Sequence, residues 1–192
     1  MEEIEVKFLE VDVGDLKDKL KLHNAKFIGE FDYKRKAYDF PGLTLSKNHH
    51  AWVRLRDEGE RVTLAYKQRM GVKVNDGSAP DEGMKEIEVV VSDFNLTDQL
   101  LKSIGLIEKF YEENKRERYV LDQVEIDIDT WPMIPTYVEF EGSSWESVEL
   151  VSRKLGFDWG KHMRCSTMQI FKKYGIDEND YSVITFLEQI KK

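Results

Sequence analysis

The opening stretch Glu3-Ile4-Glu5-Val6-Lys7 alternates charged and apolar residues without a break. Successive side chains of a β-strand point to opposite faces of a sheet, so the three charged residues share one face and the two apolar residues share the other. This spacing predicts a strand that packs one face against a core and carries only charges on the opposite face.

Six further stretches repeat this pattern. Their alternating charges are Arg54 and Arg56, Lys67 and Arg69, Glu86 and Glu88, Arg116 and Arg118, Glu125 with Asp127 and Asp129, and Glu139 and Glu141. For any single strand, a solvated face with charges paired across strands is the simpler interpretation. Taken together, the strands separate acidic from basic residues, and arginine, which suits bidentate binding of phosphate or carboxylate, prevails over lysine. The pattern therefore favours a binding site with an acidic side and a basic side.

The remaining periodicity predicts an α+β fold. Strands are predicted at residues 2–10, 27–40, 50–58, 61–70, 84–91, 115–121, 123–130 and 136–141, with a long hairpin connection at 71–83. Apolar residues at helical spacing predict helices near residues 13–22, 96–104 and 145–155, and two more at 166–174 and 181–192. Because most strands precede the later helices, the class is α+β around an antiparallel sheet or barrel.

Length and composition set limits on the protein class. A chain of 192 residues predicts a single domain over residues 1–192, with a core at 2–160 and a helical C-terminal extension at 161–192. The net charge of −8 argues against a nucleic-acid or anionic-membrane surface. The apolar runs are too short to predict a membrane span, and the residues at the start of the sequence predict no secretory leader. With Cys165 as the one cysteine, these features predict a cytoplasmic location.

An eight-stranded barrel with the charged residues inward would explain the pattern, because such a barrel can hold one small ligand. Enclosed carboxylates would be costly unless they held a cation, and enclosed Arg and Lys side chains unless they held an anion. Oxygen ligands favour Mg²⁺ or Mn²⁺ over zinc. The complementary anion would be a polyphosphate, whose oxygens the metal and the guanidinium groups could share.

These residues resemble the CYTH superfamily, the triphosphate tunnel metalloenzymes, across residues 2–141. The resemblance begins at the E-x-E-x-K motif of Glu3, Glu5 and Lys7. It continues through Trp52-Val-Arg54-Leu-Arg56-Asp57, Leu64-Ala-Tyr-Lys67, Glu86-Ile-Glu88, Arg116-Glu-Arg118-Tyr119, and Asp129 ten residues before Glu139-Phe-Glu141. The resemblance implies an eight-stranded antiparallel β-barrel with short helices outside, a divalent metal and a substrate that carries a triphosphate.

The same resemblance implies roles for individual residues. The metal-binding carboxylates would be Glu3, Glu5, Glu139 and Glu141. The triphosphate-binding residues would be Lys7, Arg54, Arg56, Lys67, Arg116 and Arg118. Glu88 and Asp129 would support the metal or the attacking water as catalytic residues, and Glu86 is a weaker candidate. Where the family often has a K-x-R pair, this chain has Asn114-Lys-Arg116 and Arg116-Glu-Arg118. Arg69, Glu125 and Asp127 are interpreted as ordinary surface charges.

The function that follows is hydrolysis, dependent on Mg²⁺ or Mn²⁺, of tripolyphosphate or a small organic triphosphate such as thiamine triphosphate or ATP. One alternative is a class IV adenylyl cyclase, which makes cyclic AMP and pyrophosphate from ATP. In the cyclases a His-Phe pair precedes the E-x-E-x-K motif, where this chain has only Met1-Glu2. Water is also easier to place than a ribose hydroxyl. The other alternative, a polyphosphate- or nucleotide-binding module without turnover, is disfavoured by the complete acidic set. A homodimer and the organic part of the substrate are left open.

Overall fold

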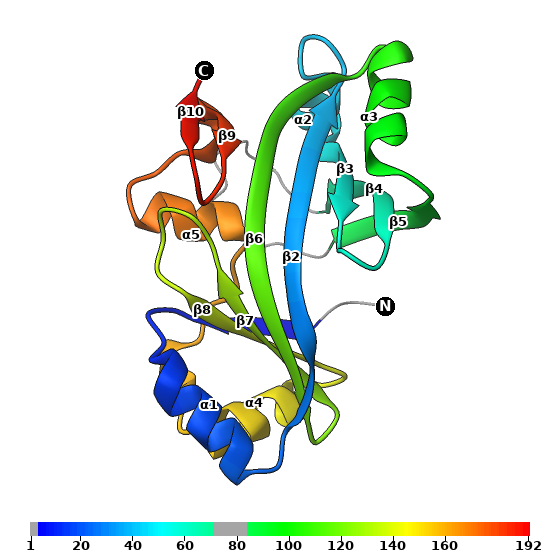
Figure 1. The fold of residues 1–192 in the computed structure, drawn as a ribbon. Helices are drawn as coiled ribbons and strands as arrows, with labels where there is room; N and C mark the ends of the chain where they lie inside the picture. The colour runs from blue at the N-terminus through cyan, green and yellow to red at the C-terminus, as the bar shows by residue number, and fades with distance from the viewer. Residues whose placement is uncertain (1–3, 71–83) are drawn as a thin grey trace. The chain divides into compact units, whose positions relative to one another are not determined.

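The computed structural model describes residues 4–70 and 84–192 (Figure 1). The chain divides into two compact units, each built from two segments. Unit 1 comprises Met1–Phe31 and Lys115–Ile170, and unit 2 comprises Asp32–Asn114 and Phe171–Lys192. Two parts of the sequence-based prediction, metal binding by Glu3 and the hairpin connection at 71–83, lie outside the described residues. The prediction of one domain over 1–192 stays a prediction.

The main strands follow the order β1-β8-β7-β6-β2-β3-β4-β5. Antiparallel pairing joins β1 to β8, β8 to β7, β7 to β6, β2 to β3, β3 to β4 and β4 to β5. The strands are β1 (Ile4–Phe8), β2 (Lys26–Asp39), β3 (Ala51–Asp57), β4 (Val62–Arg69), β5 (Met84–Val91), β6 (Ile107–Leu121), β7 (Val124–Thr130) and β8 (Tyr137–Gly142). Among the described residues, 4–70 and 84–192, no strand pairing joins β1 to β5. The described strands therefore form a large sheet and not a closed barrel.

In unit 1, two helices cover the apolar face of β1, β8 and β7 (Figure 1). They are α1 (Val13–Leu22) and α4 (Trp145–Lys154). Leu16 and Leu20 of α1 pack with Val148 and Val151 of α4 against this face, which includes the fully buried Phe140. Each helix begins at a side-chain cap: Asp12 accepts a hydrogen bond from the Asp15 amide, and Ser144 accepts one from the Ser147 amide. With their apolar face covered, the strands leave the opposite face to the charged residues.

Unit 2 repeats this plan on a smaller scale. Its core contains Tyr38, Leu55, Leu101 and Leu106, where α3 (Phe94–Ser103) packs against β2 and β3. A short helix, α2 (Thr44–His49), precedes β3 and was not predicted. Again the apolar residues of the strands lie under a helix, and the residues of opposite parity form the other face.

The C-terminal part contains five elements. They are η1 (Trp159–Lys161), α5 (Thr167–Lys173), η2 (Glu178–Asp180), β9 (Tyr181–Ile184) and β10 (Gln189–Lys191). The helix predicted at 166–174 is confirmed as α5, but the helix predicted at 181–192 is wrong. Residues 181–184 instead form β9, which pairs with β10 and lies parallel to β6.

The reason for this difference is local. Val183 and Ile184 are β-branched and favour a strand. The Thr185 hydroxyl then accepts hydrogen bonds from the amides of Leu187 and Glu188. These amides therefore do not donate to the carbonyls four residues earlier, as a helix continuing through residue 185 would require. The extension is therefore helical only in part.

Candidate functional site

The predicted alternating charges of β1, β6, β7 and β8 lie on one face of the sheet in unit 1. Directly opposed residues of an antiparallel pair share a face. The opposed pairs are Glu5 with Glu141, Lys7 with Glu139, Asp127 with Glu139, Glu125 with Glu141, Arg116 with Asp129, and Arg118 with Asp127. The strand register thus brings the predicted charges of β1, β6, β7 and β8 together, opposite the face that packs on α1 and α4.

Three carboxylates on this face form an acidic cluster, which we define as Glu5, Glu139 and Glu141. One oxygen from each lies within 4.8 Å of the others. Lys7 is only 3% exposed and lies against the cluster. Its Nζ is 2.6 Å from Glu5 Oε1 and 2.8 Å from Glu139 Oε2. The first and last charged strands of the sequence pattern therefore meet at one ammonium group.

The electrostatics of the cluster keep both partners ionised. Burial disfavours the charge on Lys7, but Glu139 and Glu5 outweigh it and raise the pKa of Lys7 above its usual value. Burial also disfavours the charge on Glu139, yet Lys7 and Arg116 outweigh it and lower the pKa of Glu139 to about 2. At neutral pH the pair is an internal salt bridge that depends on both partners.

The donor set of the acidic cluster fits a hard divalent cation. Carboxylate oxygens are the ligands that Mg²⁺, Mn²⁺ and Ca²⁺ prefer, and zinc sites are richer in nitrogen and sulfur. Glu5, Glu139 and Glu141 could each contribute one oxygen. Of the predicted metal-binding residues that the structure describes, all lie in this cluster.

Two arginines on β6 make paired contacts with aspartates on β7. Arg116 donates from Nε and Nη2 to Asp129 over 2.8 and 2.6 Å, and Arg118 donates to Asp127 over 2.8 and 2.7 Å. Asp129 is fully buried and Asp127 is 2% exposed. The interpretation of Asp127 as a surface charge is wrong, because its carboxylate is needed to balance the two guanidinium groups.

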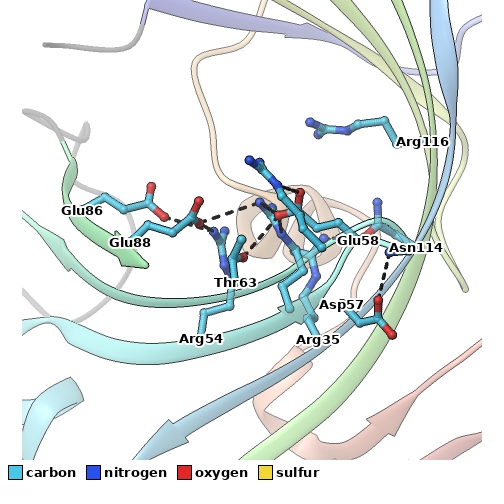
Figure 2. A network of polar contacts seen from close by, with 12 residues as sticks. Arg35, Arg54, Asp57, Glu58, Thr63, Glu86, Glu88, Asn114 and Arg116 are labelled. Atoms are coloured by element: carbon cyan, nitrogen blue, oxygen red, sulfur yellow. Dashed lines mark hydrogen bonds and ion pairs between the residues drawn. The ribbon is translucent and has the colours of Figure 1, made fainter. Parts of the chain in front are cut away.

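In unit 2, a second group of charges lies on β3, β4 and β5. Figure 2 shows Glu86 and Glu88 directed at Arg54, whose Nη2 is 3.0 Å from an oxygen of each. The Nζ of Lys67 is also 3.0 Å from Glu86. Burial lowers the pKa of Arg54, and the neighbouring charge of Arg56 lowers it further. Lys67 is affected in the same way, by burial and by Arg54. The cations on this face therefore repel one another even though carboxylates lie beside them.

Glu58 is part of this group and was missed by the sequence analysis. It is 8% exposed and accepts a hydrogen bond from Arg56 Nε over 2.8 Å (Figure 2). Burial opposes its ionisation, but hydrogen bonds from Arg61 and Arg56 lower its pKa. Glu58 follows Arg56 by two residues, so the alternation of β3 continued by one step would have indicated it.

The predicted site residues thus form two groups. Unit 1 holds Glu5, Lys7, Arg116, Arg118, Asp129, Glu139 and Glu141, and unit 2 holds Arg54, Arg56, Lys67 and Glu88. Each group is brought together by strand register within its own unit.

Two buried carboxyl groups in unit 2 were also missed. Glu112 on β6 is 4% exposed and Glu178 in η2 is 7% exposed. The Oε1 atom of Glu112 is buried without a hydrogen-bond partner. Burial raises the pKa of Glu112 to about 7, against the opposing charge of Arg35. Burial and then Glu112 raise the pKa of Glu178, although Arg35 and Arg69 oppose this rise. Both groups therefore favour the neutral form more than an exposed glutamate does.

Glu112→Gln is expected to stabilise the protein at pH 8. Folding raises the pKa of the Glu112 carboxyl from 4.5 to about 7. The folded protein therefore loses stability as pH rises through this range, by an amount on the order of 3 kcal/mol. The neutral amide removes that loss, so the melting temperature at pH 8 should rise by several degrees and the decline between pH 5 and 8 should flatten. Thermal unfolding across this range measures both effects. The exposed Glu60→Gln is the control, and a variant less stable than the wild type at pH 8 would contradict the expectation.

Comparison with known proteins gives a family and a fold. The sequence model of the CYTH domain matches residues 1–188. The structure is similar to PH1012 protein from Pyrococcus horikoshii OT3, with a TM-score of 0.66 and 20% identity over 88% of this chain and 98% of that one. It is also similar to a protein described as a putative adenylate cyclase from Vibrio parahaemolyticus, with a TM-score of 0.70 and 13% identity over 90% and 98% of the chains.

A third similar structure is a protein from Hippeastrum, described as a putative adenylyl cyclase that reveals a dominant triphosphatase activity. Its TM-score is 0.60, with 14% identity over 91% of this chain and 96% of that one. No curated protein matches the sequence. Across residues 4–70 and 84–192, no helix is long and apolar enough to cross a membrane.

Proposed function

The chain belongs to the CYTH family, and on that premise we propose that it is a divalent-metal-dependent hydrolase of inorganic tripolyphosphate or a small organic triphosphate. Members of this family include triphosphatases and adenylyl cyclases. The observation that carries the proposal is the acidic cluster around Lys7, where three carboxylate oxygens within 4.8 Å of one another fit a divalent cation.

The acidic cluster would hold Mg²⁺ or Mn²⁺, and the bound cation would neutralise charge on the phosphate oxygens. The chain itself would bind and orient the substrate. The proposed phosphate-binding residues are Lys7, Arg54, Arg56, Lys67, Arg116 and Arg118. The arginines can each donate two parallel hydrogen bonds to a phosphate. In phosphoryl transfer such positioning and charge neutralisation supply most of the rate enhancement.

Of the two proposed catalytic carboxylates, Glu88 is the better placed to accept a proton from the attacking water. Its side chain is 29% exposed, and Arg54 contacts only its Oε2 at 3.0 Å. Asp129 is fully buried, and both of its oxygens accept hydrogen bonds from Arg116. We therefore assign Glu88 the proton-accepting role and Asp129 the role of positioning Arg116. The proposal also includes the predicted closure of the eight strands into a barrel around the substrate.

The product profile tests this proposal. The purified protein would be incubated with tripolyphosphate, thiamine triphosphate or ATP, each with Mg²⁺, with Mn²⁺ and with EDTA. We expect orthophosphate release from at least one substrate, and its loss in EDTA. Cyclic AMP with pyrophosphate would instead identify an adenylyl cyclase, and binding without any product would identify a binding module. We also propose that the protein is cytoplasmic and that its partner is a triphosphate-containing small molecule and not a nucleic acid.

A further inference from the structure

Arg35 on β2 shares the charged face of unit 2, although the sequence analysis did not include it in the site. In the β2–β3 register Arg35 lies directly opposite Arg56, and Ala37 lies opposite Arg54. In the β3–β4 register Arg54 lies opposite Ala65, which in turn lies opposite Glu88. Directly opposed residues share a face. Arg35 therefore extends the row of cations from β3 onto β2.

A contact across the sheet orients the Arg35 side chain. Its Nη2 donates a hydrogen bond to Oδ1 of Asn114 on β6, the strand next to β2 (Figure 2). Asn114 is 1% exposed, whereas Arg35 is half-buried. An amide oxygen accepts a hydrogen bond without neutralising a charge. The contact with Asn114 thus fixes the direction of the guanidinium group, whose positive charge also acts on Glu112 and Glu178.

Two arginines in directly opposed positions are unfavourable in a sheet that binds nothing. Here the cost adds to the repulsion among Arg54, Arg56 and Lys67, which contributes to the lowered pKa values of Arg54 and Lys67. An anion with several charges would offset this repulsion, because it would add negative charge beside cations that already contact carboxylates. Guanidinium groups also suit phosphate oxygens, because each can donate two parallel hydrogen bonds.

We propose that Arg35 is a further substrate-binding residue, which donates hydrogen bonds to a phosphate group of the triphosphate on the same face as Arg56. This inference rests on the proposed function, since it names one more residue that binds the same substrate. Arg35 would contact the substrate directly, and Asn114 would be a positioning residue that orients Arg35.

Binding measured without turnover tests this proposal. The affinity for inorganic tripolyphosphate would be determined by calorimetry in EDTA, at several salt concentrations. Arg35→Gln should weaken binding at least about tenfold and make the affinity less sensitive to salt, because one charge–charge interaction is lost. Arg35→Lys should bind with intermediate affinity, because it keeps the charge but loses the two-pronged geometry.

The matched control is Lys34→Gln. Lys34 is exposed and lies opposite Asp57, on the other face of β2. The Lys34→Gln variant removes one positive charge at the residue next to Arg35. Its affinity for tripolyphosphate should stay within twofold of that of the wild type. If the wild type binds tripolyphosphate and the Arg35→Gln variant binds it with the same affinity, the role of Arg35 is overturned and the proposed function is unaffected. A wild type that binds no tripolyphosphate in EDTA would overturn the role of Arg35, and the product profile with Mg²⁺ or Mn²⁺ would decide the proposed function separately. Should Arg35→Gln not fold, Arg35→Lys decides, and affinity within twofold of the wild type would overturn the proposal.

Discussion

Glu5→Gln is expected to lower metal-dependent orthophosphate release by about a hundredfold or more. Glu5 contributes one of the three oxygens of the acidic cluster, and the amide that replaces it has the same shape without the negative charge. A hard cation gains most of its binding energy from charged oxygen ligands, so the loss of one carboxylate weakens both metal affinity and catalysis. Steady-state phosphate release and Mn²⁺ binding by electron paramagnetic resonance would measure the two effects separately.

Glu149→Gln is the matched control for this substitution. Glu149 lies on α4, is 38% exposed, and pairs with Arg153 at 2.8 Å on the helix surface. Its activity and its Mn²⁺ affinity should equal those of the wild type. Circular dichroism would establish that both variants fold. A folded Glu5→Gln variant with wild-type turnover would show that the acidic cluster does not hold the catalytic metal.

Lys7→Met is expected to destabilise the protein by roughly 3 to 5 kcal/mol. The Lys7 side chain is 4% exposed and lies within 2.8 Å of both Glu5 and Glu139. Removing the ammonium takes away the cation at 2.8 Å from Glu139, whose side chain is 10% exposed, and leaves Arg116 beside it at 3.7 Å. Breaking a buried pair costs about this much. Urea unfolding in EDTA at pH 7 would measure the change in the free energy of unfolding.

Lys17→Met provides the comparison for Lys7→Met. Lys17 pairs with Glu117 at 2.7 Å, but the two side chains are 41% and 25% exposed. Solvent-exposed pairs of this kind contribute at most about 1 kcal/mol. We also expect added Mn²⁺ to restore more stability to Lys7→Met than to the wild type, since a cation can replace the missing ammonium. Equal destabilisation by both substitutions would mean that the Lys7 pair is not an internal salt bridge.

The sheet and its two faces could be predicted because strand alternation is a local property of the sequence. Ile4, Val6 and Phe8 determine the buried face of β1 without reference to any other strand. The α1 and α4 helices were predictable for the same reason, from apolar residues at helical spacing. The positions of β1 to β5, β7 and β8 were therefore found to within a few residues.

What could not be predicted depends on which strands become neighbours. Arg35 lies in the run Lys34-Arg35-Lys36, where consecutive charges conceal which parity faces the cation row. Only the register with β3 identifies it. Glu112 and Glu178 are far apart in the sequence, and their mutual burial follows from the parallel pairing of β9 with β6. The β6 strand itself begins at Ile107, well before the predicted residue 115, because charges interrupt the alternation in its first half.

Which acidic residues of unit 1 are buried could also not be predicted from local sequence patterns. Glu125, Asp127 and Asp129 alternate alike in the sequence, yet Asp129 is fully buried while Glu125 is 32% exposed at its side chain. The difference arises from the partner strands, which supply Arg116 to Asp129. Alternation thus identifies the face of a charge, and only the register identifies its partner.

The most direct test of the account is a crystal structure with Mn²⁺ and tripolyphosphate, using anomalous scattering to locate the metal. We expect a manganese peak coordinated by oxygens of Glu5, Glu139 and Glu141, with triphosphate density beside the ion and in contact with Lys7. Manganese and phosphate bound elsewhere, with these carboxylates facing bulk solvent, would contradict the central claim that the charged faces of the sheet are a metal–triphosphate site.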